Sequence, residues 1–360
     1  MIWILPTVTL AAAVESQDLR LWDLDRLGRE AFKNSNYNDA ELYFRRALDR
    51  AEVDKVSNAD LVVAVSNLAE TLRIKASYDE SEKLFDRALK ILETGGTADS
   101  YRASVLLNLG RLYQETRRYA LSEKLFKETL RFTKQKLGPR HPTIAELLLS
   151  LGTIYSVSNR NKLAEKTFLE ATVFIQRNIG SDNILLAQVL SSLGVSYWKQ
   201  KKWTRAESMF LQSLDITEHS RGPYDLDMAA ILDNLGGFYY TRGNLVEAET
   251  TLRRALELRI KVFGPGNLTV ALTSVRLAMV LTAQGNYTEA RLWYAKSLRT
   301  QEQSLGPRTP EVAATLEEFA KLLHQMNNVD EAVAMEARAK TIRTELKYMM
   351  RVPTNGVSPR

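Results

Sequence analysis

The sequence predicts an all-α protein, a right-handed superhelical solenoid of about eight helix-turn-helix hairpins. Three observations support this fold class. A recognisable segment returns every 42 residues along most of the chain, and a small residue recurs in the middle of the first helix of every unit. The 360 residues also contain few breakers, with 9 prolines and 17 glycines, which favours long helices over a turn-rich β protein. Stacked hairpins bury a continuous core that no single hairpin could build.

The period is clearest in the linkers between hairpins. The run LGPRHPTIA at 137–145 has later counterparts that each start 42 residues after the last, at 179–187, 221–229, 263–271 and 305–313. Two earlier units fit the same register with one residue fewer. Prolines in these linkers end one helix and set up the next, at Pro142, Pro223, Pro265 and Pro307.

Seven residues beyond each linker lies a position that we call the central small residue. It is Gly28, Ala69, Gly110, Gly152, Gly194, Gly236, Ala278 and Ala320 in units one to eight. Glycine inside a helix costs about 1 kcal/mol relative to alanine, so a close approach of another helix must offset that cost. The pattern therefore predicts a tight helix crossing in every unit.

The second helix of each unit carries a matching pattern. Small residues frame an aromatic or large apolar residue sixteen positions after the central small residue: Phe44, Phe85, Phe126, Phe168, Phe210, Leu252 and Tyr294. The spacing of four and then three puts the three positions on one helix face. We expect the small residues to admit the partner helix and the large side chain to fill the gap.

These motifs resemble the tetratricopeptide repeat. Unit three shows the signature as Leu109-Gly110, Tyr113, Ser122-Glu123 and Phe126. The period exceeds the usual one of about 34 residues, and the GlyProxHisPro linker resembles the long repeats of kinesin light chains. The resemblance covers about residues 21–345, and it implies a non-enzymatic role in holding another protein.

The chain divides into three predicted parts: 1–15, a signal peptide or apolar tail; 16–345, the solenoid; and 346–360, the end of a cap and a disordered tail. The apolar run 2–13 is shorter than the roughly 20 residues that span a bilayer. It fits a secretory signal with cleavage near Ala11–Ala13, which would make the protein periplasmic or secreted. The alternative is an apolar tail of a cytoplasmic protein, which packs on the first hairpin or stays disordered. Glu336 breaks the aromatic series, and the helix after it is read as a cap.

The sequence offers little for catalysis. There is no cysteine, and the three histidines, His141, His219 and His324, lie far apart in the chain. Phosphate-binding glycine motifs are absent. We therefore predict no enzymatic activity, no catalytic residue, no cofactor and no metal site. Glutamates that recur on the second helices are read as exposed i,i+4 pairs, namely Glu41 with Arg45, Glu123 with Lys127 and Glu249 with Arg253.

The first helices should line the concave face, which holds extended or helical peptides in tetratricopeptide proteins. Two residues before the central small residue lie Asn67, Asn108, Ser150, Ser192 and Asn234. An amide can donate and accept at once, as a peptide group requires, and the resemblance to kinesin light chains and chaperone-binding relatives implies that use. The alternative is that these side chains bond neighbouring helices.

Two further patches are predicted on the same face. Arg73 and Arg111 form a basic end, flanked by Glu70 and Glu115. Units five to seven present an apolar patch of Val195, Trp198, Tyr240, Val275 and Met279. A partner segment with an apolar anchor and an acidic end would match both patches. The alternative for Trp198 is packing within the superhelix.

The predicted function is a scaffold or adaptor that binds a protein or peptide of unknown identity in this groove, without an integral membrane segment. The sequence does not give the oligomeric state, and a monomer is taken as the default. One alternative is a sensor or partner module of a signalling system. A nucleic-acid-binding array is the weaker alternative, since the net charge is only +6. The basic cluster Lys199, Lys201, Lys202 and Arg205 falls at an intra-hairpin turn, where charge is usually solvated.

Overall fold

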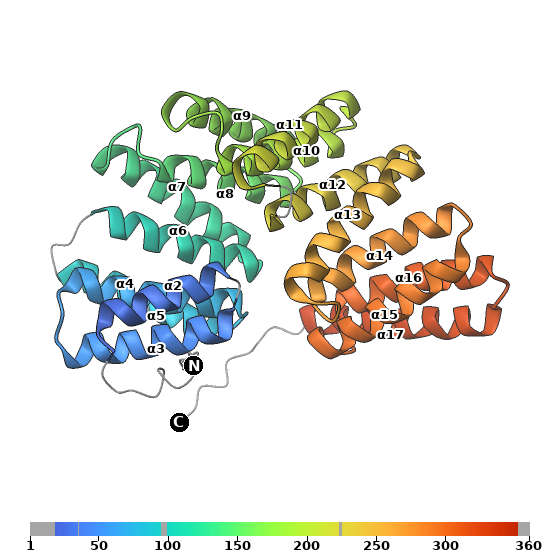
Figure 1. Ribbon diagram of the computed structural model, residues 1–360, viewed down its shortest axis with the longest axis horizontal. Coiled ribbons are helices and arrows are strands. Elements are labelled where there is room, and N and C mark those ends of the chain that lie inside the picture. Colours follow the sequence, from blue (N-terminus) through green and yellow to red (C-terminus); the bar gives the residue numbers. More distant parts are fainter. Residues whose placement is uncertain (1–18, 35, 95–98, 223–224, 352–360) are drawn as a thin grey trace, which may run out of the picture. The chain divides into compact units, whose positions relative to one another are not determined.

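The computed structural model of the chain describes residues 19–34, 36–94, 99–222 and 225–351. These residues form sixteen α-helices and contain no strand. Figure 1 shows the helices in antiparallel pairs that follow one another along the chain. The predicted all-α repeat fold is confirmed. The chain separates into two compact units, which divide after Asn178, and each is described by itself.

Four hairpins make up the first unit. They are α2 (Leu21–Lys33) with α3 (Tyr37–Val53), α4 (Asn58–Ile74) with α5 (Tyr78–Thr94), α6 (Asp99–Glu115) with α7 (Tyr119–Lys136), and α8 (Thr143–Val157) with α9 (Asn161–Asn178). First helices of consecutive hairpins also touch, as α4 touches α6 and α6 touches α8.

The second unit repeats this arrangement. Its hairpins are α10 (Ile184–Lys199) with α11 (Trp203–Arg221), α12 (Leu226–Arg242) with α13 (Leu245–Phe263), α14 (Leu268–Ala283) with α15 (Tyr287–Leu305), and α16 (Pro310–Gln325) with α17 (Val329–Arg351). The core runs through successive hairpins, and one buried cluster extends from Ala248 in α13 to Ala332 in α17. Each hairpin therefore depends on its neighbours to bury its apolar face.

The central small residues lie against the large side chain of the second helix, as predicted. A Cβ atom added at Gly28 would lie 2.6 Å from the Phe44 ring, and one at Gly194 would lie 2.8 Å from the Phe210 ring. Gly236 faces Leu252 at 2.6 Å in the same way, and Gly110 and Gly152 face Phe126 and Phe168. In these units not even a methyl group fits unless the facing side chain moves.

A second set of glycines has a different cause. The second residue of each linker has a positive φ, with no atom within 4 Å of an added Cβ: Gly138, Gly180, Gly222, Gly264 and Gly306. These glycines follow the second helices, where a left-handed or extended positive-φ residue ends the helix. Glycine is therefore required in the linker because of its backbone conformation. At the central position it is required because the facing side chain leaves no room for a Cβ atom.

In units two to eight, the turn inside the hairpin also contains a left-handed residue, seven positions after the central small residue. Glycine or asparagine occupies this position at Asn159, Gly243, Gly285 and Asn327. The other described units place Ala76, Arg117 and Lys201 there, with φ of 60°, 59° and 58°. Sequence reasoning did not single out this position, because three of its occupants carry no turn signal.

The two ends of the chain bear on the predicted boundaries. Residues 1–18, which include the predicted signal peptide or tail, lie outside the described part, as do residues 352–360. The expected cap belongs to one continuous helix, α17, which starts at Val329, passes Glu336 and ends at Arg351. Glu336 takes the aromatic position of unit eight, and its Oε1 lies 3.0 Å from His324 Nε2.

Candidate peptide-binding face

Residues near the centre of the first helices form a ladder between hairpins. The Asn67 Nδ2 group donates to Asp25 Oδ1 on the preceding first helix, at 2.7 Å. Bonds to the preceding first helix also occur in the second unit. Arg276 Nη1 lies 2.8 Å from Asp233 Oδ2, and Asn234 Nδ2 lies 3.5 Å from Ser191 Oγ. At Asn67 and Asn234 the amide therefore makes the inter-helix contact that the alternative reading expects.

The other three predicted groove positions differ from one another. Asn108 accepts a hydrogen bond from Arg111 Nη1 at 3.3 Å, and no described residue accepts one from its amide NH2 group. Ser150 is buried, and Ser192 Oγ donates to the carbonyl of Gln188. Asn108 thus keeps donors for a peptide carbonyl.

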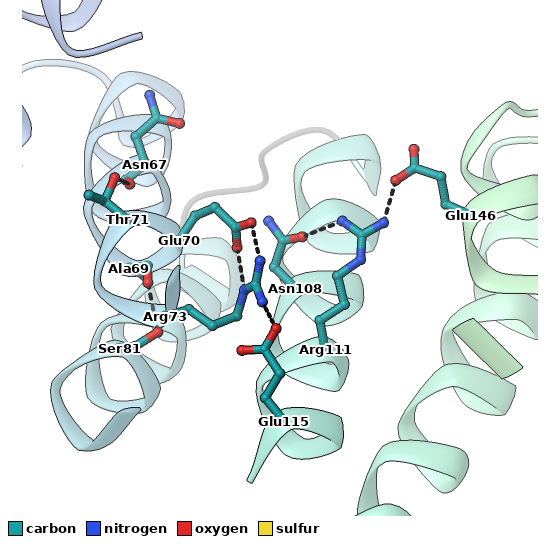
Figure 2. Close-up of polar contacts among 10 residues, drawn as sticks. All are labelled: Asn67, Ala69, Glu70, Thr71, Arg73, Ser81, Asn108, Arg111, Glu115 and Glu146. Carbon is teal, nitrogen blue, oxygen red and sulfur yellow. Dashed lines mark hydrogen bonds and ion pairs between the residues drawn. The ribbon is translucent and has the colours of Figure 1, made fainter. Parts of the chain in front are cut away.

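The predicted basic end is neutralised by carboxylates. Arg73 is 9% exposed, and it bonds Glu70 at 2.7 and 3.0 Å and also Glu115 on the next first helix (Figure 2). Burial works against its charge, but the two carboxylates outweigh it and raise the pKa of Arg73. Arg111 Nη2 bonds Glu146 Oε2 at 2.8 Å. Both arginines join consecutive first helices. Because each is already paired with a carboxylate, neither is an unpaired arginine for the acidic end of the expected partner.

Two adjoining hollows lie on the first-helix face of the first unit. One, of about 190 Å³, lies between α4 and α6 and is lined by Val62, Val63, Ser66, Asn67, Glu70, Tyr101, Ser104, Val105 and Asn108. The other, of about 310 Å³, lies between α2 and α4 and is lined by Leu21, Trp22, Asp25, Asp60, Val63 and Ala64. We call them the inner hollow and the outer hollow. Val63 lines both, so they form one surface across three first helices.

These hollows combine apolar walls with free polar atoms. Trp22 is 55% exposed although it is the largest residue in the outer hollow. In the inner hollow the Ser66 hydroxyl is buried and has no hydrogen-bond partner among the described residues. Sequence reasoning missed Trp22, Asp60 and Val63. Trp22 and Val63 both lie six residues before the central small residue, so their shared offset could have revealed them.

The aromatic patch of the second unit is partly used in packing. The Trp198 ring meets Phe238 edge-on, with centroids 6.2 Å apart, and a Cβ added at Gly237 would lie 3.1 Å from Trp198 Cη2. Tyr240, Val275 and Met279 are half-buried against the core cluster of α13 to α17. Val195 is also half-buried. The packing of Trp198 is what the alternative reading expects.

The glutamates of the second helices form an edge ladder that joins hairpins. The predicted i,i+4 pairs are present, with Glu41–Arg45 at 2.8 Å, Glu123–Lys127 at 2.6 Å and Glu249–Arg253 at 2.8 Å. Glu123 also bonds Arg160 of the next hairpin at 2.6 Å, and Glu82 bonds Arg118 at 2.8 Å. The Arg160 hydrogen bond, together with Lys127, lowers the pKa of Glu123 to about 2. These glutamates therefore connect consecutive hairpins, in addition to the pairing within one helix that was predicted for them.

The described residues show no group of three or more histidine, aspartate or glutamate side chains arranged to hold a metal ion. Each histidine has a different neighbour. His141 Nδ1 accepts a hydrogen bond from the Thr143 amide, His219 lies beside Asp215, and His324 lies beside Glu336. None of the described helices is long and apolar enough to cross a membrane. In the basic cluster, Lys202 and Arg205 lie over the Tyr197 ring.

Comparison with known families agrees with this repeat geometry. The sequence profile of the tetratricopeptide repeat matches residues 60–135, 101–175, 143–219, 185–261 and 269–345. The chain belongs to the tetratricopeptide repeat family. No curated protein matches it significantly.

Several solved structures are similar to this chain. The apo form of the quorum sensor NprR from B. thuringiensis is 13% identical, with a TM-score of 0.65, and the match covers 93% of this chain and 91% of that one. BtubC (BKLC) from P. vanneervenii is 22% identical with a TM-score of 0.50, over 67% of this chain and 92% of its own. The nearly identical TPR-like repeats of a Podosopora anserina kinesin light chain candidate are 16% identical, with a TM-score of 0.49, over 59% and 99%.

Proposed function

We propose that this protein is a non-enzymatic scaffold that binds a peptide segment of another protein on the first-helix face of α2, α4 and α6. The observation that carries the proposal is the pair of adjoining hollows that share Val63. The hollows combine an apolar lining with a few polar atoms, which is the usual make-up of a ligand-binding surface.

The chemistry of the hollows suits a peptide. Leu21, Trp22, Val63 and Val105 offer apolar walls for one or two side chains, and Asn108 has a free amide donor for a backbone carbonyl. Exposed aromatic residues such as Trp22 are common anchors at binding surfaces. Tyr101 is also exposed at the rim of the inner hollow.

The test is selection from a random peptide library on the immobilised chain. Val63→Arg places a long charged side chain in both hollows, so the selected peptides should bind this variant at least about tenfold more weakly. The matched control is Leu42→Arg, at a position on α3 that is 47% exposed and outside the hollows. Equal affinity for both variants, with unchanged melting of each, would overturn the proposal.

A sensor module of a signalling system is the second candidate. It is favoured by the fold shared with apo NprR, a quorum sensor, along most of the chain. A sensor should change conformation when a free peptide binds, whereas a scaffold should not. Small-angle scattering of the chain with and without a selected peptide separates the two.

A further inference from the structure

The hollows of the first unit carry an excess of negative charge. Asp25, Asp60 and Glu70 line them, and within the described part of the chain no lysine or arginine does. This balance is the opposite of the basic end predicted from Arg73 and Arg111.

Two of the three carboxylates already have a cation. Glu70 is bonded by Arg73 at 2.7 Å, and Asp25 is bonded by Arg29 of the same helix. Just before α2, Arg20 lies over the Trp22 ring at 5.1 Å and 3.8 Å from Asp23, and on α2 Arg26 lies 3.9 Å from Glu30. Each of these arginines therefore already lies within 4 Å of a carboxylate three or four residues away in the chain.

Asp60 is the carboxylate of these three that has no ion pair with a described lysine or arginine. Its side chain is exposed and accepts a hydrogen bond from Ser57 Oγ at 2.7 Å. It stands in the outer hollow beside Trp22 and Val63. A negative group next to an apolar wall complements a positive group next to an apolar side chain.

We infer that the segment bound here carries an apolar side chain with a lysine or arginine one or two residues away. The apolar side chain enters the hollows around Val63, and the cation pairs with Asp60. The inference rests on the proposed function and specifies its partner.

The spacing follows from the geometry of α4. Asp60 and Val63 are three residues apart on one helix, which is about 4.5 Å along its axis. An extended peptide advances about 3.3 Å per residue. A cation one or two residues from the apolar side chain therefore reaches Asp60.

The experiment uses peptides selected from a random library on the full chain. Each selected peptide is also synthesised with its lysine or arginine changed to glutamine and to glutamate. The selected peptide and its two substituted forms are each titrated against the wild type and Asp60→Asn. Asp39→Asn is the matched control, because Asp39 is also exposed and bonded to its helix cap, Asn36, but lies on the second helix α3.

We expect Asp60→Asn to weaken the cationic peptides by about three- to fivefold, the scale of an exposed ion pair. The glutamine peptides should be insensitive to this change, and Asp39→Asn should alter neither. Added salt should reduce the difference in affinity between the cationic peptides and the glutamine peptides.

Two results would overturn the inference. Peptides that depend on Val63 but prefer no charge, or prefer glutamate, would refute the cation while leaving the proposed function intact. A selection that yields no peptide sensitive to Val63→Arg would refute both. Thermal melting of Asp60→Asn shows that the helix cap survives, since asparagine keeps an oxygen that can accept from Ser57.

Discussion

Glycine serves two separate purposes in this chain, and the structure distinguishes them residue by residue. At Gly194 the reason is space, because the Phe210 ring occupies the volume where a side chain would begin. At Gly222 the reason is conformation, since φ is +85° and nothing lies near an added Cβ. The two kinds should therefore respond differently to substitution.

Replacing Gly194 by leucine should destabilise the second unit by about 3 kcal/mol or more, because overpacking at a helix crossing forces both helices to move. The measurement is the urea midpoint followed by circular dichroism. Ser208→Leu is the control, as Ser208 is exposed on α11 and should change the free energy of unfolding by less than about 0.5 kcal/mol. A wild-type midpoint for Gly194→Leu would contradict the close crossing.

Ala76 illustrates the opposite case. It occupies the left-handed turn position with φ of 60°, a conformation that costs a non-glycine residue about 1–2 kcal/mol. Ala76→Gly should therefore raise the free energy of unfolding by about 1 kcal/mol. The same change at Ala337, exposed in the interior of α17, should lower it by about 1 kcal/mol. Two losses of similar size would show that the turn carries no strain.

Between the helices, charged side chains join neighbouring hairpins. These ion pairs lie on the first-helix face and along the edge formed by the second helices. On the first-helix face Arg73 and Arg111 connect α4, α6 and α8 through Glu115 and Glu146. On the second-helix edge, Glu82 and Glu123 bond arginines of the following hairpin. These contacts fix each hairpin against the next in addition to the apolar core.

The edge ladder predicts a sensitivity to acid. The pKa of Glu123 is lowered to about 2 from its ordinary value of 4.5, chiefly by the Arg160 hydrogen bond. A lowered pKa in the folded state stabilises the fold fully above the unfolded value. That contribution is lost as the pH falls from about 4.5 towards 2. The urea midpoint should therefore be level near neutral pH and fall across this window.

Glu123→Gln should flatten the fall in that window and also lower the urea midpoint near neutral pH by a similar amount, because the stabilisation that acid removes is the one that the substitution removes. This amount should be small, because the partners Arg160 and Lys127 are exposed. Glu128→Gln is the matched control, since Glu128 is exposed on the same helix and has no ion pair among the described residues. An acid profile unchanged by Glu123→Gln would rule out this carboxylate as a source of the sensitivity.

Across the whole molecule, a side chain on the first helices can serve either the core or a binding surface. The first helices must pack on each other and also offer a face to a partner. In the first unit, Trp22 stays exposed and hollows remain open. In the second unit, Trp198 is packed against Phe238 and Gly237. The first unit is therefore the better candidate for binding.

Replacing Trp198 by alanine should accordingly lower the stability of the second unit by about 2 kcal/mol, less than the loss for a fully buried tryptophan. Tyr240→Ala should act in the same direction. Chemical denaturation measures both, with Leu211→Ala, 48% exposed on α11, as the control. Variants that lose partner capture at wild-type stability would instead identify the aromatic patch as a binding site.

The sequence alone determined the fold class, the register of the hairpins and the reason for the central glycines. Each of these depends on a pattern that repeats, so eight copies make the signal strong even where one copy, such as Glu336, departs from it. The contacts of Gly28 with Phe44 and of Gly194 with Phe210 follow that pattern directly.

Only the tertiary structure decided which polar residues are already paired. Arg73 and Glu115 are 42 residues apart, as are Asn67 and Asp25, and they meet because adjacent first helices stack in register. Whether a side chain on this face is free depends on what the neighbouring repeat places opposite it. That varies from unit to unit, so the repeat pattern predicts the position of such a residue but not its partner. The shared offset of Trp22 and Val63 marks both as residues of this face, but that they line open hollows together with Asp60 became visible only once the helices were placed.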